Sequence, residues 1–162
     1  MRSSPSTAAF IAFLCALGTY AAAGPSPGAA QAPASACDSS LWKHVYNPKR
    51  LRKISPCITV SGTVAISLPD DDGDQHFLLM LDAGQGSLLT KRNQKKKEGA
   101  LVVEVVCANP TKLRKPKLAC AGYTNQIALP GVGDHVRVTG THVIDSHNGW
   151  AEIHPVSKIV KL

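Results

Sequence analysis

Acidic residues and histidines gather in two separate stretches of the sequence, and both carry groups that bind metals or move protons. In the first, DDDGDQH, the residues Asp72, Asp74 and His76 alternate along the chain. In the second, near the end, Glu152 and His154 stand two residues apart, directly before a proline. Converging carboxylate and imidazole groups suit either a divalent metal ion or a general acid/base pair. Both interpretations require a fold that brings the two stretches together.

Each stretch also has an ordinary structural interpretation. Aspartate and glycine are common turn formers, so DDDGDQH would serve as a connection between two strands. Alternate carboxylates on a tight turn also suit calcium, which takes six to eight oxygens, although the glycine and the distal glutamate of an EF-hand are placed differently. A single histidine is usually a surface or hydrogen-bonded residue, so only convergence of several groups indicates a site.

Five segments have the length and composition of β-strands. They are rich in β-branched and apolar residues, are bounded by turn signals, and cover 57–68, 75–82, 100–107, 134–145 and 150–160. A short amphipathic helix is predicted over 41–46, ended by Pro48. Five strands without repeated helical partners favour an antiparallel sandwich or barrel. Gly62 and Gly140 lie in mid-strand, where a small closed barrel needs sharp bends.

The interval 108–133 contains three prolines and several glycines, which argue against a long regular helix there. The order of strands, glycine bends and this interval resembles the oligonucleotide/oligosaccharide-binding (OB) fold over 54–162. The predicted fold is therefore all-β, a five-stranded OB-like Greek-key barrel with a short N-terminal helix.

In an OB fold, the connections between strands one and two and between strands four and five border the same binding face. The second connection here carries Asp145 and His147. We therefore predict a ligand-binding site formed by Asp74, His76, Asp145, His147, Glu152 and His154. The candidates for catalysis are His76, Glu152 and His154, and the candidates for holding a divalent metal are Asp72, Asp74 and His76.

The first residues have the layout of a secretory signal peptide. A single positive charge precedes an apolar run and small residues, which predicts cleavage after Ala23. The run is short and interrupted for a membrane span, and an uncleaved anchor is the alternative. Residues 24–40 form a Pro/Ala/Gly-rich linker, and 41–162 form the domain. The mature chain is predicted to have no transmembrane segment and to be secreted or periplasmic.

Four cysteines remain after the predicted signal peptide, an even number in a chain expected in an oxidising compartment. Such a set predicts two disulfides. Of the three pairings, we favour the one between sequence neighbours, Cys37 with Cys57 and Cys107 with Cys120. A zinc site is the alternative, but Cys-x-x-Cys spacing is missing.

Positive charge is unevenly distributed in a chain of net charge +7. Lysines and arginines cluster at 43–53, 112–117 and 91–97, the last including Lys95, Lys96 and Lys97. Such clusters favour anionic partners, although solvated loops also carry them. Few aromatic residues are available for base stacking, and the acidic turn would repel phosphate. The sequence therefore argues against sequence-specific nucleic-acid recognition.

Three motifs resemble those of small exported prokaryotic proteins of uncharacterised function. They are D-G-D-x-H, L-V-V-E and G-W-x-E-I-H-P-V, found here at 72–76, 101–104 and 149–156. The resemblance spans most of the domain and implies no particular activity. Those proteins often have a histidine directly before Gly-Trp, where this chain has Asn148 and places His147 one residue earlier.

The D-G-D turn also resembles thermonuclease-like OB proteins, whose catalysis uses calcium, carboxylates and arginines. Asp74 would match one metal ligand of that family. The next strand here lacks the family's arginine, and the D-x-P-E segment is missing. Without an arginine to stabilise transition-state charge, that nuclease mechanism is not supported.

The sequence thus predicts an exported, disulfide-stabilised binding or interaction module. An anionic partner, such as an acidic polymer or an envelope component, is slightly favoured. One alternative is a metal-dependent hydrolase acting on phosphodiesters through Asp74, His76, Glu152 and His154. Another is a structural envelope protein without a small ligand.

Overall fold

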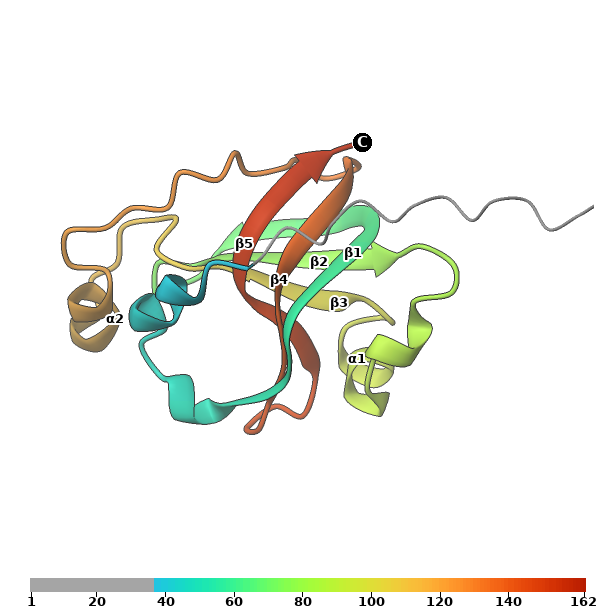
Figure 1. Ribbon diagram of the computed structural model, residues 1–162, viewed down its shortest axis with the longest axis horizontal. Helices are drawn as coiled ribbons and strands as arrows, with labels where there is room; N and C mark the ends of the chain where they lie inside the picture. The colour runs from blue at the N-terminus through green and yellow to red at the C-terminus, as the bar shows by residue number, and fades with distance from the viewer. Residues whose placement is uncertain (1–36) are drawn as a thin grey trace, which may run out of the picture. The chain divides into compact units, whose positions relative to one another are not determined.

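A computed structural model describes residues 37–162, whose five strands form one closed sheet (Figure 1). The strands are β1 (Leu51–Pro69), β2 (Gln75–Leu81), β3 (Leu101–Val105), β4 (His135–Asp145) and β5 (Ala151–Lys161). Their order in the sheet is β1, β2, β3, β5 and β4, and β4 pairs back with β1. Every pair is antiparallel except β3 with β5. The prediction of a mostly β fold with five strands is confirmed.

The predicted signal peptide, residues 1–23, and most of the predicted linker, 24–40, lie outside the described residues. The first described residues, Cys37 and Asp38, are already attached to the sheet. Cys37 is bonded to Cys57, and the backbone N–H of Asp38 donates to Ser157 Oγ at 3.0 Å. Within 37–162, no helix has the length and apolar character needed to span a membrane.

Strand β1 closes the sheet because its 19 residues pair with two neighbours. Its first two thirds pair with β4, and its last third pairs with β2. Gly62 lies where the two pairings overlap, and a Cβ there would stand 2.2 Å from the carbonyl oxygen of Met80. The glycine predicted to bend this strand is therefore required by a close approach of backbones.

A second close approach joins β4 to β5. A Cβ on Gly140 would lie 2.5 Å from Ile153 Cγ2 and 2.6 Å from the carbonyl oxygen of Pro155. The register shifts here, because two residues of β5, His154 and Pro155, oppose the single residue between Gly140 and His142. Pro155 therefore occupies a bulge, as its missing N–H favours.

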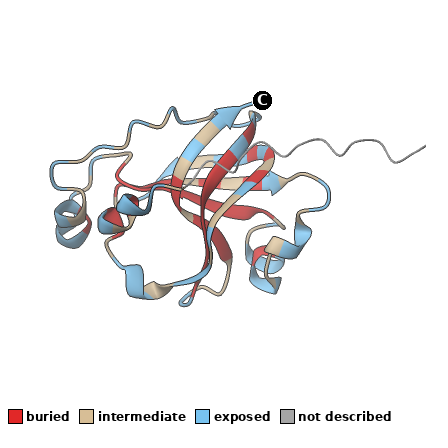
Figure 2. Ribbon diagram, viewed as in Figure 1, coloured by how far each residue is buried: buried red, intermediate tan, exposed pale blue. Residues whose placement is uncertain are grey.

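Side chains alternate between an inner core and an outer face. The core is apolar and includes Phe77, Val103 and Ile153, all at most 1% exposed. On the outer face, the N-terminal segment covers the end of β3, where Val45 packs with Val106 and Cys107. Strand β3 is consequently buried along its whole length, and Figure 2 shows this buried stretch within the sheet.

Short helices connect and cover the strands. They are the 3-10 helices η1 (Ser39–His44), η2 (Pro48–Arg50) and η3 (Gly86–Leu88) and the α-helices α1 (Lys91–Lys96) and α2 (Arg114–Ala119). The predicted N-terminal helix corresponds to η1, whose first turn is capped by the Asp38 side chain. Helix α1 forms in a basic segment to which the sequence analysis assigns no helix. Thr90 and Asn93 cap it reciprocally, which satisfies two otherwise free donors at its start.

Both predicted disulfides are present, and the pairing between sequence neighbours is confirmed. Cys37 joins Cys57 with a Cα–Cα distance of 5.4 Å, and Cys107 joins Cys120 with a distance of 5.6 Å. The first ties the start of the domain to β1. The second closes the loop that carries α2, in the interval where the sequence predicted no long helix.

Reduction of the disulfides is expected to lower the free energy of unfolding by about 3 kcal/mol for each bond, because each bond restricts the conformational entropy of the unfolded chain. Denaturant titration with and without reductant measures the change. The double variant Cys107→Ser/Cys120→Ser isolates the second bond. An unchanged unfolding midpoint after complete reduction, verified by thiol counting, would contradict this expectation.

Candidate functional site

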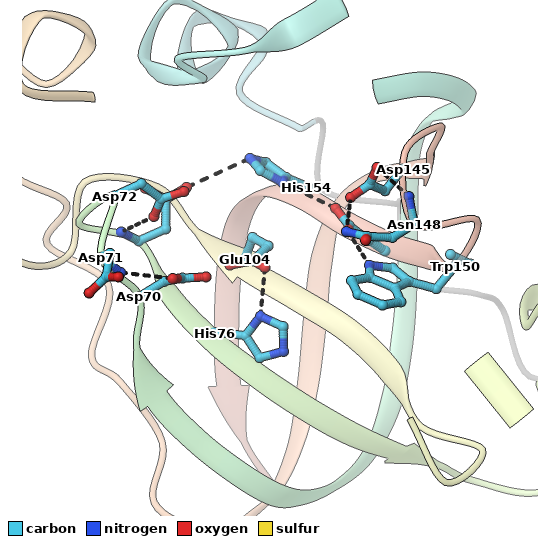
Figure 3. Close-up of polar contacts among 12 residues, drawn as sticks. Asp70, Asp71, Asp72, His76, Glu104, Asp145, Asn148, Trp150 and His154 are labelled. Carbon is cyan, nitrogen blue, oxygen red and sulfur yellow. Dashed lines mark hydrogen bonds and ion pairs between the residues drawn. The ribbon is translucent and has the colours of Figure 1, made fainter. Parts of the chain in front are cut away.

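Polar residues meet on the outer face of β2, β3 and β5, where two register relations align them. His76 on β2 stands opposite Glu104 on β3. The parallel pair of β3 and β5 sets Val102 beside Glu152. Because side chains alternate along a strand, Glu104, Glu152 and His154 leave the sheet on the same side. Figure 3 shows Glu104 between His76 and His154.

Glu104, Glu152 and His154 border a strongly acidic pocket of about 230 Å³, which His76 adjoins through its contact with Glu104. The segment before β1, the turn between β1 and β2, and strands β3 and β5 enclose it. Two cationic groups, Arg50 and His154, face it. Six carboxylates line it: Asp70, Asp71, Asp72, Glu104, Asp145 and Glu152. The excess of carboxylates favours a cationic ligand over an anionic one.

Glu104 is a buried carboxylate that contacts a histidine on the neighbouring strand. Its Oε1 lies 2.7 Å from His76 Nδ1, whereas its Oε2 is buried and has no hydrogen-bond partner among residues 37–162. Burial raises the pKa of Glu104 well above its ordinary value. Burial also lowers the pKa of His76. Both shifts have the same origin, the loss of water around a charged form.

His154 stands between two further carboxylates. Its Nδ1 lies 3.3 Å from Glu152 Oε2, and its Nε2 lies 3.8 Å from Asp74 Oδ2. Burial alone would lower the pKa of His154, but the contact with Glu152 and the charges of Glu104 and Asp74 raise it to about 9. At neutral pH the imidazole is therefore protonated and offsets part of the negative charge. Trp150 orients Glu152 by donating from Nε1 to Oε1 at 2.6 Å.

The acidic turn is fixed by backbone N–H groups of the turn itself and of the residue Cys107 beyond β3. Asp74 Oδ1 accepts the N–H of Cys107 at 2.8 Å, and Asp72 Oδ1 accepts the N–H of Asp74 at 3.1 Å. Burial, together with the charges of Asp72 and Asp70, raises the pKa of Asp74 to about 7. Burial raises the pKa of Asp72 as well. These contacts hold the turn against the start of β2.

Asp145 closes the rim of the pocket through an ion pair. Arg50 donates to Asp145 Oδ2 from Nε at 2.8 Å and also from Nη2. The backbone N–H groups of His147 and Asn148 donate to Oδ1, and Asn148 Nδ2 donates to Oδ2. Burial would raise the pKa of Asp145, but these donors hold it below its ordinary value. The carboxylate is thus already satisfied by protein groups.

The structure brings together most, though not all, of the residues predicted to bind a ligand. His154 contacts both Asp74 and Glu152, and His76 contacts Glu104. In the described part of the chain, one group of metal-ligating side chains has its ligand atoms within 4.8 Å of one another: Asp70, His76 and Glu104. This group shares only His76 with the predicted metal set of Asp72, Asp74 and His76. The side chains of Asp72 and Asp74 each accept a backbone N–H instead.

The remaining predicted residues lie at the edge of this region. His147 is exposed, and its backbone N–H, not its ring, contacts Asp145. Lys95 and Lys96 are exposed on α1. The ammonium group of Lys97 lies 4.1 Å from the ring centre of Trp150, a cation–π contact beside the pocket.

Sequence reasoning missed Glu104, Arg50 and Asp70 as members of the site. Glu104 carried a usable signal, since it is the one charged residue in the apolar strand Leu101–Val105. A charge in such a strand must be paired or neutralised, which marks a functional candidate. Arg50 precedes β1 without a distinctive pattern, whereas Asp70 begins the stretch DDDGDQH, from which only Asp72, Asp74 and His76 were chosen; the closure of the sheet places Arg50 and Asp70 at one pocket.

A scan against protein-family models finds no model that matches this chain, and a search of curated proteins finds no match either. The function is therefore inferred from the geometry of the site.

Proposed function

We propose that the closed sheet is an OB-like Greek-key barrel. Its support is the strand order β1, β2, β3, β5 and β4 with parallel pairing of β3 and β5. In this fold the connections β1–β2 and β4–β5 border one binding face. Asp70 begins the β1–β2 connection and Asp145 is the last residue of β4, and both line one pocket in this protein.

The protein is accordingly a disulfide-stabilised binding module that takes a small cation in the acidic pocket. The observation that carries this proposal is the set of six carboxylates facing two cationic groups in about 230 Å³. The two disulfides favour action outside the reducing cytoplasm. The anionic partner predicted from Lys95, Lys96 and Lys97 would contact α1 instead of the pocket and stays a prediction. The hydrolase and the structural envelope protein stay predictions as well.

Ligand-induced stabilisation tests the proposal. Thermal unfolding of the oxidised protein is followed with Ca²⁺, Mn²⁺, Zn²⁺ or a small diamine, and separately with sulfate. At about 100 times its Kd, a bound cation adds about 2.7 kcal/mol to the free energy of unfolding and raises the midpoint by several degrees. Sulfate is expected to produce no such rise.

Two variants locate the binding. Glu152→Gln removes a carboxylate from the pocket and is expected to weaken the cation effect, whereas Glu98→Gln removes an exposed carboxylate that does not line the pocket and leaves the effect unchanged. Stabilisation by sulfate but by none of the cations would overturn the proposal. Equal losses in the two variants would place the cation elsewhere and overturn it too.

A further inference from the structure

Three metal-ligating side chains from separate segments meet beside the pocket, which Asp70 and Glu104 line and His76 does not. Asp70 comes from the turn after β1, His76 from β2 and Glu104 from β3. Each offers one ring nitrogen or carboxylate oxygen, and these atoms lie within 4.8 Å of one another. Figure 3 shows Asp70, His76 and Glu104 converging over the outer face of the sheet. Pairing of β2 with β3 fixes the relation between His76 and Glu104.

A buried oxygen without a partner provides a second and independent indication of a ligand. Glu104 is only 9% exposed, and its Oε2 makes no hydrogen bond within residues 37–162. Desolvating a carboxylate oxygen without a compensating partner costs free energy, so proteins seldom retain such an atom without a use for it. A bound cation would supply the missing partner.

We propose that the cation is a divalent transition-metal ion of the zinc type, bound by Asp70, His76 and Glu104. This inference rests on the proposed function and names the chemical class of the ligand. Bonds from zinc to nitrogen and oxygen are roughly 2.0 to 2.2 Å long, so the ligand atoms of a tetrahedral ion stand roughly 3.3 to 3.6 Å apart. Side-chain movements of about 1 Å would bring the three ligand atoms, which lie within 4.8 Å of one another, to that spacing.

The imidazole of His76 decides the class of metal. Calcium and magnesium take oxygen ligands almost exclusively, whereas imidazole suits zinc, copper, nickel and iron. One nitrogen and two oxygens also leave a position open for a water molecule or a further ligand. Asp70 is exposed, so that position faces solvent.

The surroundings favour an ion over other ways of satisfying Glu104. Further carboxylates line the same pocket, and the cations that face it, Arg50 and His154, already contact Asp145 and Glu152. The four cysteines of the described chain do not compete for a soft metal, because both pairs are disulfides. The ligand set is therefore nitrogen and oxygen alone.

Titration of the oxidised full chain with Co²⁺ tests the inference, since protein-bound Co²⁺ absorbs visible light according to its ligands. We expect one bound Co²⁺, displaced by Zn²⁺ but not by a similar concentration of Ca²⁺. His76→Gln and Glu104→Gln are each expected to weaken Co²⁺ binding by about 100-fold or more, since even residues that only support metal ligands contribute 10- to 100-fold. Glu104→Gln keeps the shape of the side chain but alters its contact with His76, so thermal unfolding of the metal-free variant is measured first to confirm that it is folded.

His135→Gln is the matched control. His135 also contacts a carboxylate, Asp82, at 3.0 Å, but it is exposed and does not belong to the cluster of Asp70, His76 and Glu104. Its Co²⁺ affinity is expected to equal that of the unaltered protein. If Ca²⁺ binds and His76→Gln changes nothing, the site is an oxygen-only cation site, and the metal inference fails while the proposed function stands. If no cation binds to the unaltered protein, both fail.

Discussion

Gly140→Ala is expected to lower the free energy of unfolding by about 3 kcal/mol. The added Cβ would stand 2.5 Å from Ile153 Cγ2 and 2.6 Å from the carbonyl oxygen of Pro155. Ile153 is fully buried in the core and Pro155 is held in a bulge, so neither can withdraw without moving β5. Equilibrium denaturation of the two proteins measures the difference.

Gly86→Ala is the matched control for this change. A Cβ at Gly86 would meet nothing within 4 Å. This substitution is expected to leave the free energy of unfolding within about 0.5 kcal/mol of the original value. Since His154 lies in the displaced bulge, Gly140→Ala should also weaken cation binding, whereas Gly86→Ala should not. Equal stabilities of the two variants would show that β4 and β5 do not approach as described.

Asp145→Asn is expected to cost about 2 to 3 kcal/mol of stability at neutral pH. The carboxylate is completely buried and accepts hydrogen bonds from Arg50 and from two backbone N–H groups. An amide in its place presents an NH₂ group to donors and leaves the arginine unpaired. The usual cost of breaking a buried pair is about 3 to 5 kcal/mol, reduced here because Arg50 is about one third exposed.

This loss should depend on pH in a defined direction. The pKa of Asp145 is lower in the folded state than the value of about 3.9 expected in the unfolded chain. Its contribution is therefore fully present above about pH 5 and disappears as the pH falls through the folded pKa. The stabilities of the original protein and Asp145→Asn should converge in acid. A difference that grows below pH 4 would contradict this assignment.

Asp82→Asn provides the control for both statements. Asp82 also has a lowered pKa and also accepts from Ser61 and His135, but its side chain is 40% exposed. Water screens the charges of an exposed pair, so this variant should lose much less stability than Asp145→Asn at neutral pH. Urea titrations at several pH values provide both comparisons.

The strands were predictable because their signals are local. Alternation and β-branched residues located all five, and the ends of β2 and β4 agree with the prediction within one residue. The prediction that the first strand begins at residue 57 was wrong, because the strand begins at Leu51. Residues 51–56 contain charged residues and a proline, which argue against a strand when the sequence is considered alone. Pairing with the end of β4 holds this segment extended, and tertiary pairing overrides local propensity.

The site was predictable only in part, because its geometry depends on register. Glu152 and His154 stand two residues apart in the sequence, and alternation along a strand accordingly places both on the pocket side, with Ile153 between them in the core. The contact between His154 and Asp74 followed from the expected borders of the binding face. Glu104 could not be placed, because its position beside β5 depends on a parallel pairing that leaves no local mark in sequence.

The parallel pairing of β3 with β5 also has a kinetic consequence. The pocket combines residues from the first turn, the central strand and the last strand, so it exists only after β3 has paired with β5 and β1 with β4, both pairings between segments far apart in sequence. Such pairings place the chain among proteins that fold slowly, in milliseconds to seconds. A partly folded chain would lack one wall of the pocket. Ligand binding should consequently distinguish fully folded molecules from folding intermediates.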